Sequence, residues 1–145
     1  MRKFTFVAPL ALATLVIAGC ATAAAAPAAG PAASGGTVSA ALTDMKISVD
    51  RTSVNAGEVT FVVKNNGLVT HELVVIQTDV AQDKLAMNMD EAGKMDETGN
   101  LGETGDVLAG ASKAFTVTLA AGTYVLICNE VGHYGSGMHM AFTVN

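Results

Sequence analysis

The chain has 145 residues, enough for one domain with its own core after an N-terminal targeting segment is set aside. Trp is absent and aromatic residues make up 5%, so the core must be built mainly from Val, Leu, Ile and Ala. The net charge is −5, or −7 without Arg2 and Lys3, and this acidic balance argues against nucleic acid as a partner.

Residues 1–19 are predicted to be a signal peptide. Two basic residues precede an apolar stretch, Phe4 to Ile17, that is too short to cross a membrane comfortably. It ends Ile17-Ala18-Gly19-Cys20, which resembles the lipobox of bacterial lipoproteins. The resemblance implies cleavage before Cys20 and its lipidation, so we expect a lipid-anchored protein in the periplasm or on the outer cell surface. The alternative is an ordinary secretory signal, cut nearer the alanines at 21–26.

Residues 20–36 are predicted to be a linker. They are almost all Ala, Pro and Gly, so they offer few side chains from which a core could be built. A flexible coil of this length spans about 20 Å. We therefore expect the folded domain to occupy residues 37–145.

Short strands separated by turn residues are predicted from Thr37 onward. The alternation in the next-to-last strand places Tyr124, Leu126 and Cys128 on one face and the residues between them on the other. The expected strands are Val38–Leu42, Lys46–Val49, Glu58–Lys64, His71–Gln77, Ala114–Leu119, Thr123–Cys128 and a last strand with Met140, Phe142 and Val144. This pattern is typical of an all-β Greek-key sandwich.

Residues 78–110 interrupt the strand pattern. Val80 to Met89 is predicted to form a short helix, and Glu91 to Gly105 is acidic and Gly-rich and is predicted to be a loop. The whole insertion carries eight acidic residues against two lysines. It is either a docking surface for a basic partner or a solvated loop with no partner.

Three soft or borderline donors lie close together near the C-terminus, as Cys128-x4-His133-x4-Met138. Taken singly, they would read as a buried structural thiol, an exposed loop imidazole and a core thioether. The glycine-rich spacing favours one ion wrapped by all three. Thiolate, imidazole and thioether together select copper over harder ions.

A fourth ligand must come from elsewhere in the chain. His71 is the preferred candidate, although a lone His beside a strand is more often structural. His139 is the other, but it adjoins Met138, and neighbouring residues on a strand point to opposite faces.

With these residues in place, the chain resembles the cupredoxins, the small blue copper proteins of the plastocyanin/azurin type. The resemblance covers about Thr37 to Asn145 and is strongest in Asn65-Asn66-Gly67-Leu68-Val69-Thr70-His71-Glu72-Leu73 and from Tyr124 to Met138. The loop spacing is similar to that of rusticyanin and auracyanin. The resemblance implies one type 1 copper ion, held by His71, Cys128, His133 and Met138, that passes between Cu(II) and Cu(I) without catalysing a reaction.

Two further expectations come with the resemblance. Many members have Asn after the first His, where it ties the ligand loops together; here Glu72 stands in that place, and Asn129 is expected to supply part of the tie. The expected electron port is His133, in an apolar patch with Tyr134 and Gly135. The expected partners are redox proteins, such as a basic cytochrome or an oxidase, together with the membrane through the lipid anchor.

The main rival hypothesis is an exported copper chaperone or copper-tolerance lipoprotein. Its soft Cu(I) donors would include Met87, Met89, Met95, Met140 and His139. These methionines do not repeat at a motif spacing, and helix packing is the simpler account of those at 87–95. A non-metal adhesive sandwich, in which Cys128 would be dispensable, is a third hypothesis.

Overall fold

The computed structural model describes residues 34–145, so the predicted signal peptide, Cys20 and most of the predicted linker lie outside the described residues. Within this range the chain forms nine strands: β1 Ser34–Thr43, β2 Lys46–Val49, β3 Ser53–Val54, β4 Gly57–Asn65, β5 Val74–Gln77, β6 Asn100–Glu103, β7 Ser112–Leu119, β8 Gly122–Ile127 and β9 His139–Val144. The first strand starts at Ser34, inside the predicted linker. No helix that could span a membrane occurs among these residues.

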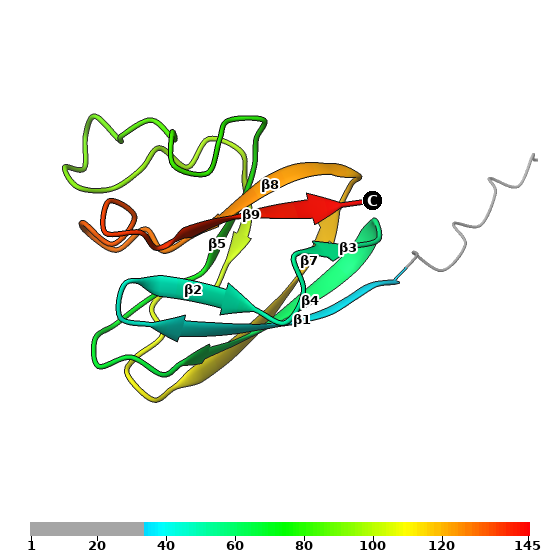
Figure 1. Cartoon of the computed structure of the whole chain (residues 1–145), viewed down its shortest axis with the longest axis horizontal. Coiled ribbons are helices and arrows are strands. Elements are labelled where there is room, and N and C mark those ends of the chain that lie inside the picture. Colours follow the sequence, from blue (N-terminus) through cyan, green and yellow to red (C-terminus); the bar gives the residue numbers. More distant parts are fainter. Residues whose placement is uncertain (1–33) are drawn as a thin grey trace, which may run out of the picture.

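The strands form two sheets that face each other (Figure 1). One has the order β2-β1-β4-β7 and the other β3-β9-β8-β5-β6. The pairs β1–β4 and β3–β9 are parallel, whereas the remaining neighbours are antiparallel. This arrangement confirms the predicted all-β sandwich.

The main core lies between the sheets and follows the alternation of the strands. In β4, Val59, Phe61 and Val63 are fully buried, whereas Val62 points outward and is 42% exposed. The Phe61 ring stacks on Phe115 of β7, its register partner, with the ring centroids 5.3 Å apart. Since aromatic pairs stabilise a core beyond the effect of buried area, this stack strengthens the contact between β4 and β7.

A second, smaller cluster covers the outer face of the sheet that contains β8. It consists of Val74, Ile76, Met95, Val125, Ile127 and Tyr134. Residues 78–98 run across this face, as the green segment at the top of Figure 1 shows. Strand β8 therefore buries both of its faces, which explains why apolar residues occupy successive positions from Tyr124 to Ile127.

The predicted helix at Val80–Met89 is wrong, because residues 34–145 contain no helix. Instead, Met87 pairs with Met95 in an isolated antiparallel bridge. The Tyr134 hydroxyl accepts a hydrogen bond from Leu85 N, and the Asn88 side chain accepts from the backbone amides two and three residues further along. Side-chain oxygens therefore bond the backbone N–H groups that helical carbonyls would otherwise bond. Met89 is 93% exposed, whereas Leu85 is partly buried against the second cluster, so the expected apolar face does not pack as a unit.

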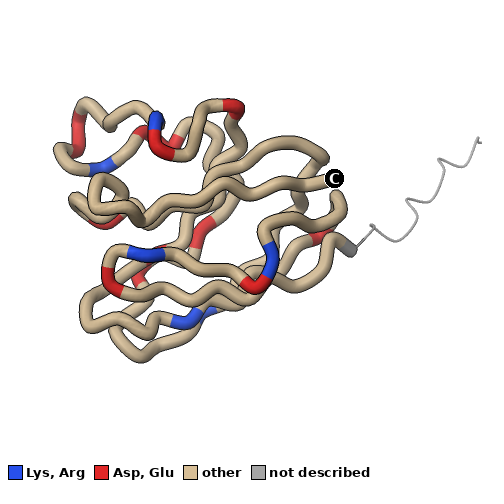
Figure 2. The backbone as a smooth tube through the Cα atoms, viewed as in Figure 1, with Lys and Arg blue, Asp and Glu red and all other residues tan. Residues whose placement is uncertain are grey.

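The predicted loop at Glu91–Gly105 is also wrong in part. Its Asn100–Glu103 stretch forms strand β6, which pairs with β5 at the edge of the second sheet. Its one large apolar side chain, Leu101, is 41% exposed, so the strand carries no alternating apolar pattern in the sequence and only its pairing partner reveals it. The 78–110 insertion carries eight acidic residues and two lysines, and Figure 2 shows the resulting excess of acidic over basic positions.

Candidate metal centre

Three predicted donors converge at the end of the sandwich where the β4–β5 and β8–β9 connections lie. His71 Nδ1 is 3.2 Å from His133 Nδ1, and Cys128 Sγ is 3.3 Å from His133 Nδ1 and 3.8 Å from His71 Nδ1. These residues form a group that could hold a metal ion. The segments that carry them are more than fifty residues apart in the sequence, so the fold brings them together.

The spacing of the donors fits a single first-row ion. Such ions bond imidazole nitrogen and thiolate sulfur at roughly 2.0–2.3 Å, so donors 3.2–3.8 Å apart can share one. Met138, at the end of the loop that carries Cys128 and His133, is fully buried and would supply the soft thioether. Two imidazoles, a thiolate and a thioether suit copper, and the group of converging donors contains no carboxylate.

The Cys128–Met138 loop is closed by its own backbone. Cys128 N donates to Met138 O at 3.0 Å, and Met138 N donates to His133 O at 3.1 Å. Gly132 and Gly137 have φ angles of 80° and 109°, a conformation that residues with a Cβ rarely adopt. The glycines thus let a short loop turn sharply enough for all three side chains to face one point.

The segment that carries His71 is held by a buried amide and a neighbouring strand. His71 and Val107 exchange two backbone hydrogen bonds, of 3.2 and 2.6 Å. The Asn65 side chain, which is fully buried, donates to Val69 O and Val107 O and accepts from Gly67 N, each at 2.8 Å. The predicted turn at Asn65-Asn66-Gly67 is therefore the support that fixes the first imidazole.

The environment of Cys128 favours a metal over a free thiolate. Burial raises the pKa of the thiol to about 11, although amide hydrogen bonds from Glu72 and Glu130 oppose the rise. The Glu72 amide is 3.4 Å from Sγ. Burial, followed by the nearby His71, lowers the pKa of His133, so this imidazole is neutral at pH 7 and its ring nitrogen is available as a ligand. A coordinated metal would deprotonate the thiol.

Glu72 and Asn129 meet beside the site, through the Glu72 side chain and the Asn129 backbone. Asn129 N donates to Glu72 Oε1 at 3.1 Å. Burial, with smaller contributions from three neighbouring glutamates, raises the pKa of Glu72 to about 7. The Asn129 side chain turns the other way, toward Met95 and Glu97 of the insertion. It therefore connects the ligand loop to the insertion, a contact that the sequence did not suggest.

The other predicted site residues lie in different surroundings. His133 is partly exposed, whereas Tyr134 is only 7% exposed. The Tyr134 hydroxyl donates to Gln82 O at 2.7 Å and accepts from Leu85 N at 3.0 Å, which fastens the insertion to the loop. His139 packs against the Tyr134 ring and does not belong to the donor group, as its strand position predicted.

Asp44 is a site residue that sequence reasoning missed. Its Oδ1 lies 3.2 Å from Nε2 of His71, on the side of the ring that faces away from Cys128. Hydrogen bonds from the Leu68 amide and from His71 hold the pKa of this carboxyl below its usual value. Asp44 lies in a two-residue turn 27 residues upstream of His71, and no local pattern connects the two.

Comparison with known families agrees with this geometry. Residues 35–145 match the family described as copper binding proteins of the plastocyanin/azurin type. The chain belongs to this family. The cupredoxin domain so defined contains all four predicted ligands and both sheets. A comparison with functionally curated proteins finds no significant match.

Solved structures share the fold of this cupredoxin. Reduced auracyanin from the photosynthetic bacterium Roseiflexus castenholzii is 24% identical, with a TM-score of 0.57, covering 78% of this chain and 98% of its own. Auracyanin B is 26% identical, with a TM-score of 0.58 and coverages of 81% and 93%. Rusticyanin from Thiobacillus ferrooxidans is 20% identical, with a TM-score of 0.56 and coverages of 78% and 79%.

Family membership and donor geometry together define the site. His71, Cys128, His133 and Met138 are positioned as the ligands of one type 1 copper ion. Cupredoxins transfer electrons to redox partners, and electron transfer is the function consistent with this site.

Proposed function

We propose that this cupredoxin is an exported electron carrier without enzymatic activity, and that it exchanges single electrons with its partners through His133. The observation that carries the proposal is the convergence of three donors, of which only His133 reaches solvent. His71 and Cys128 are fully buried, as is Met138. A partner protein can therefore approach the donor set most closely at the His133 ring.

Bound copper would supply the one-electron couple between Cu(II) and Cu(I), and the chain supplies the surroundings. The Cys128 thiolate is the strongest donor and receives the Glu72 amide hydrogen bond. Backbone bonds within the ligand loop and between His71 and Val107 hold the imidazoles in place. Because these backbone bonds do not involve the ligand atoms, we expect the donor positions to change little when the charge at the site changes.

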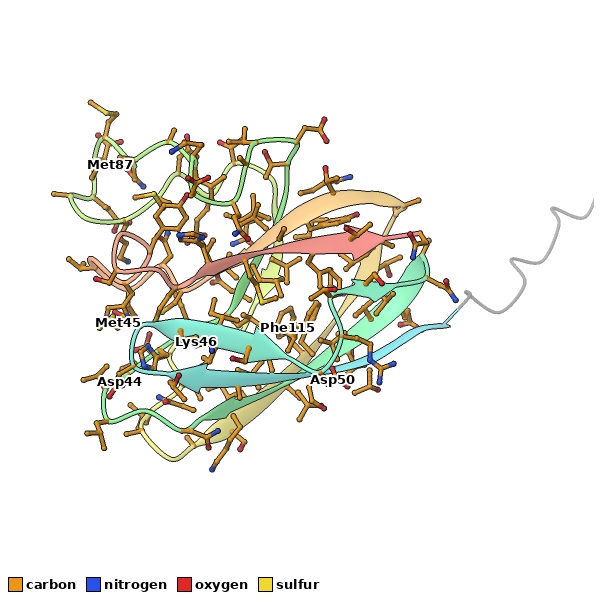
Figure 3. All side chains as sticks on the ribbon, viewed as in Figure 1. Asp44, Met45, Lys46, Asp50, Met87 and Phe115 are labelled. Atoms are coloured by element: carbon orange, nitrogen blue, oxygen red, sulfur yellow. The ribbon has the colours of Figure 1, made fainter. Side chains whose placement is uncertain are left out.

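Exposed apolar side chains at this end of the sandwich support a protein docking surface around His133. Leu68, Val69 and Val131 are 86%, 45% and 63% exposed, and Met45 is 39% exposed. The turn that contains Met45 lies at the same end as the β8–β9 connection (Figures 1 and 3). The apolar surface would form the contact, and the net negative charge of this protein would favour a basic redox partner, such as a cytochrome or an oxidase.

We further propose that residues 1–19 export the chain and that acylated Cys20 anchors it to a membrane. The support is the sequence alone: a basic start, an apolar stretch and small residues before Cys20. Mass spectrometry of the protein from membranes tests it. A diacyl or triacyl Cys20 at the N-terminus is the expected result, with Cys20→Ala released into the soluble fraction; an unmodified N-terminus among residues 21–26 would refute the anchor.

Optical and EPR spectra of the Cu(II)-loaded protein test the electron-transfer proposal. We expect an intense thiolate-to-copper band that Cys128→Ser abolishes and His71→Ala alters. His139→Ala is the matched control, because it removes a nearby imidazole outside the donor group and should leave the band unchanged. A colourless protein that binds only Cu(I) would refute the proposal.

Copper handling is the second candidate function. Met87 and Met89 expose 55% and 93% of their surface, so two thioethers are accessible to Cu(I). The reversible reduction potential and the rate of copper exchange with a chelator distinguish the two functions. An electron carrier shows a reversible potential and retains its copper for hours. A copper-handling protein releases copper rapidly and slows its exchange when both methionines are replaced by Leu.

A further inference from the structure

The outer nitrogen of the buried His71 ring contacts a carboxylate. His71 has no exposed surface, and its Nε2 lies 3.2 Å from Asp44 Oδ1, whereas its Nδ1 faces Cys128 and His133. We propose that Asp44 is the positioning residue of this site: it holds the proton of His71 on Nε2, aims Nδ1 at copper and lowers the reduction potential. The inference rests on the proposed electron-transfer function.

The ring nitrogen that must bind the metal determines the tautomer of His71. A neutral imidazole carries one proton, so an Nδ1 that faces the other donors must leave that proton on Nε2. An N–H buried without an acceptor is costly, and the Asp44 carboxylate provides the acceptor. The opposite tautomer would place a lone pair against the carboxylate and a proton toward Cys128, so both contacts disfavour it.

The neighbouring backbone is shaped to admit this contact. A Cβ added at Gly67 would lie 2.3 Å from Asp44 Oδ1 and 2.9 Å from His71 Nε2, so a side chain there would displace the carboxylate or the ring. The Leu68 amide donates to the same Oδ1 at 2.9 Å. The carboxylate is therefore held from two sides, in a gap that only glycine leaves open.

The turn that presents Asp44 is itself strained. Asp44 and Met45 form the two-residue connection between β1 and β2, with Thr43 and Lys46 as register partners. Met45 has a φ of 62°, which is uncommon for a residue other than glycine. A strained turn beside a ligand indicates that the position of Asp44 is over-determined by its surroundings.

The carboxylate also has an electrostatic consequence. A negative charge on the far side of the imidazole makes His71 a more basic ligand, and it stabilises Cu(II) more than Cu(I). Asp44→Asn keeps an oxygen acceptor but removes the charge. We expect it to retain the blue spectrum and to shift the equilibrium toward Cu(I) by roughly three- to tenfold, the upper value corresponding to about 59 mV for one electron.

The test compares four variants by reduction potential, Cu(II) affinity and NMR of the diamagnetic Cu(I) form. Asp44→Ala removes the acceptor and should lower Cu(II) affinity by about 10- to 100-fold. Gly67→Ala keeps the charge but displaces it, and should imitate Asp44→Ala in affinity. Asp50→Asn is the matched control: the same chemical change at the other end of the β1–β2 hairpin (Figure 3), where the side chain bonds Arg51 and the Ser39 amide.

Long-range ¹H–¹⁵N spectra report the His71 tautomer directly. The expected result is an Nε2–H proton that exchanges slowly in the wild type and in Asp44→Asn, and rapidly in Asp44→Ala and Gly67→Ala. Equal reduction potentials in Asp44→Asn and Asp50→Asn would overturn the role of Asp44, as would unchanged Cu(II) affinity and Nε2–H exchange in both alanine variants. Either result would leave the proposed electron-transfer function standing. A wild-type protein without the thiolate-to-copper band would overturn the proposed function, and this role with it.

Discussion

Replacing Asn129 by Ala should release the insertion from the ligand loop while leaving the sandwich folded. Asn129 is 2% exposed. Its Oδ1 accepts from Met95 N at 2.7 Å, and its Nδ2 donates to Met95 O at 3.0 Å and to Glu97 Oε1 at 2.7 Å. The substitution deletes all three bonds, but the backbone bond from Asn129 N to Glu72 Oε1 remains.

The free energy lost in Asn129→Ala can be estimated from the polar groups that lose their hydrogen-bond partners. The N–H and C=O of Met95 are buried, and each unsatisfied group of this kind costs about 1–3 kcal/mol. Glu97 lies nearer the surface and can recover its bond from water, so it adds little. Opening the segment hydrates Met95, which limits the total to about 2–4 kcal/mol. The loss should therefore appear as easier local opening of residues 86–97.

Amide hydrogen exchange followed by mass spectrometry measures this local opening. A change of 2–4 kcal/mol corresponds to an acceleration of about 30- to 1,000-fold. We expect it for the amides of Met95 and Asp96 but not for those of β4 and β7. Asn88→Ala is the control, because it removes an exposed amide that caps Asp90 and Glu91 in the same segment. Equal acceleration in every strand, or none in 86–97, would refute the reasoning.

Three further predictions concern the core, a turn and the pH dependence. Phe61→Ala should lower the free energy of unfolding by about 3–5 kcal/mol in urea titrations, because its fully buried ring packs on two others, whereas the exposed Leu68→Ala should change it by less than about 0.5. Met45→Gly should raise it by about 0.5–1 kcal/mol by relieving the φ of 62°; a loss would show that the Met45 side chain matters more than its backbone. In the copper-free protein, the raised pKa of Glu72 means that the folded state holds a proton which the unfolded state has released, so stability should fall as pH rises from about 4.5 to about 7. Because Glu72 is partly exposed, the fall should be only about 1–2 kcal/mol, and Glu72→Gln should abolish it in unfolding curves taken across that range.

The sequence predicted the parts of this cupredoxin whose determinants are local. Cys128, His133 and Met138 lie within eleven positions, and closing a loop of that size requires only glycines at the turns. Strand alternation likewise placed Phe61 and Tyr124 in the core, because the two-residue period of a strand directly assigns each side chain to a face.

The parts that could not be predicted depend on contacts between distant segments. The stretch at 80–89 has apolar residues at helical spacing, yet the Tyr134 hydroxyl, about fifty positions later, takes the donor and acceptor groups that a helix would use. Strand β6 has no apolar face and exists because β5 offers it an edge. Asp44 reaches His71 only because the β1–β2 turn and Gly67 meet at one point.

These distant contacts divide the support of the site into two parts that can be perturbed separately. Asp44 acts on His71 from the β1–β2 turn, through one hydrogen bond to the ring. Asn129 and Tyr134 lie in the β8–β9 connection, beside Cys128 and His133, and their hydrogen bonds fasten the insertion to it. The two sets share no residue, so their effects should be additive. Asp44→Asn should therefore shift the potential equally in wild-type and Asn129→Ala backgrounds, and Asn129→Ala should accelerate exchange at 86–97 equally with or without the Asp44 charge. A double variant that departs from additivity by more than about 0.5 kcal/mol in either measurement would show that the ligand loops transmit strain from one support to the other.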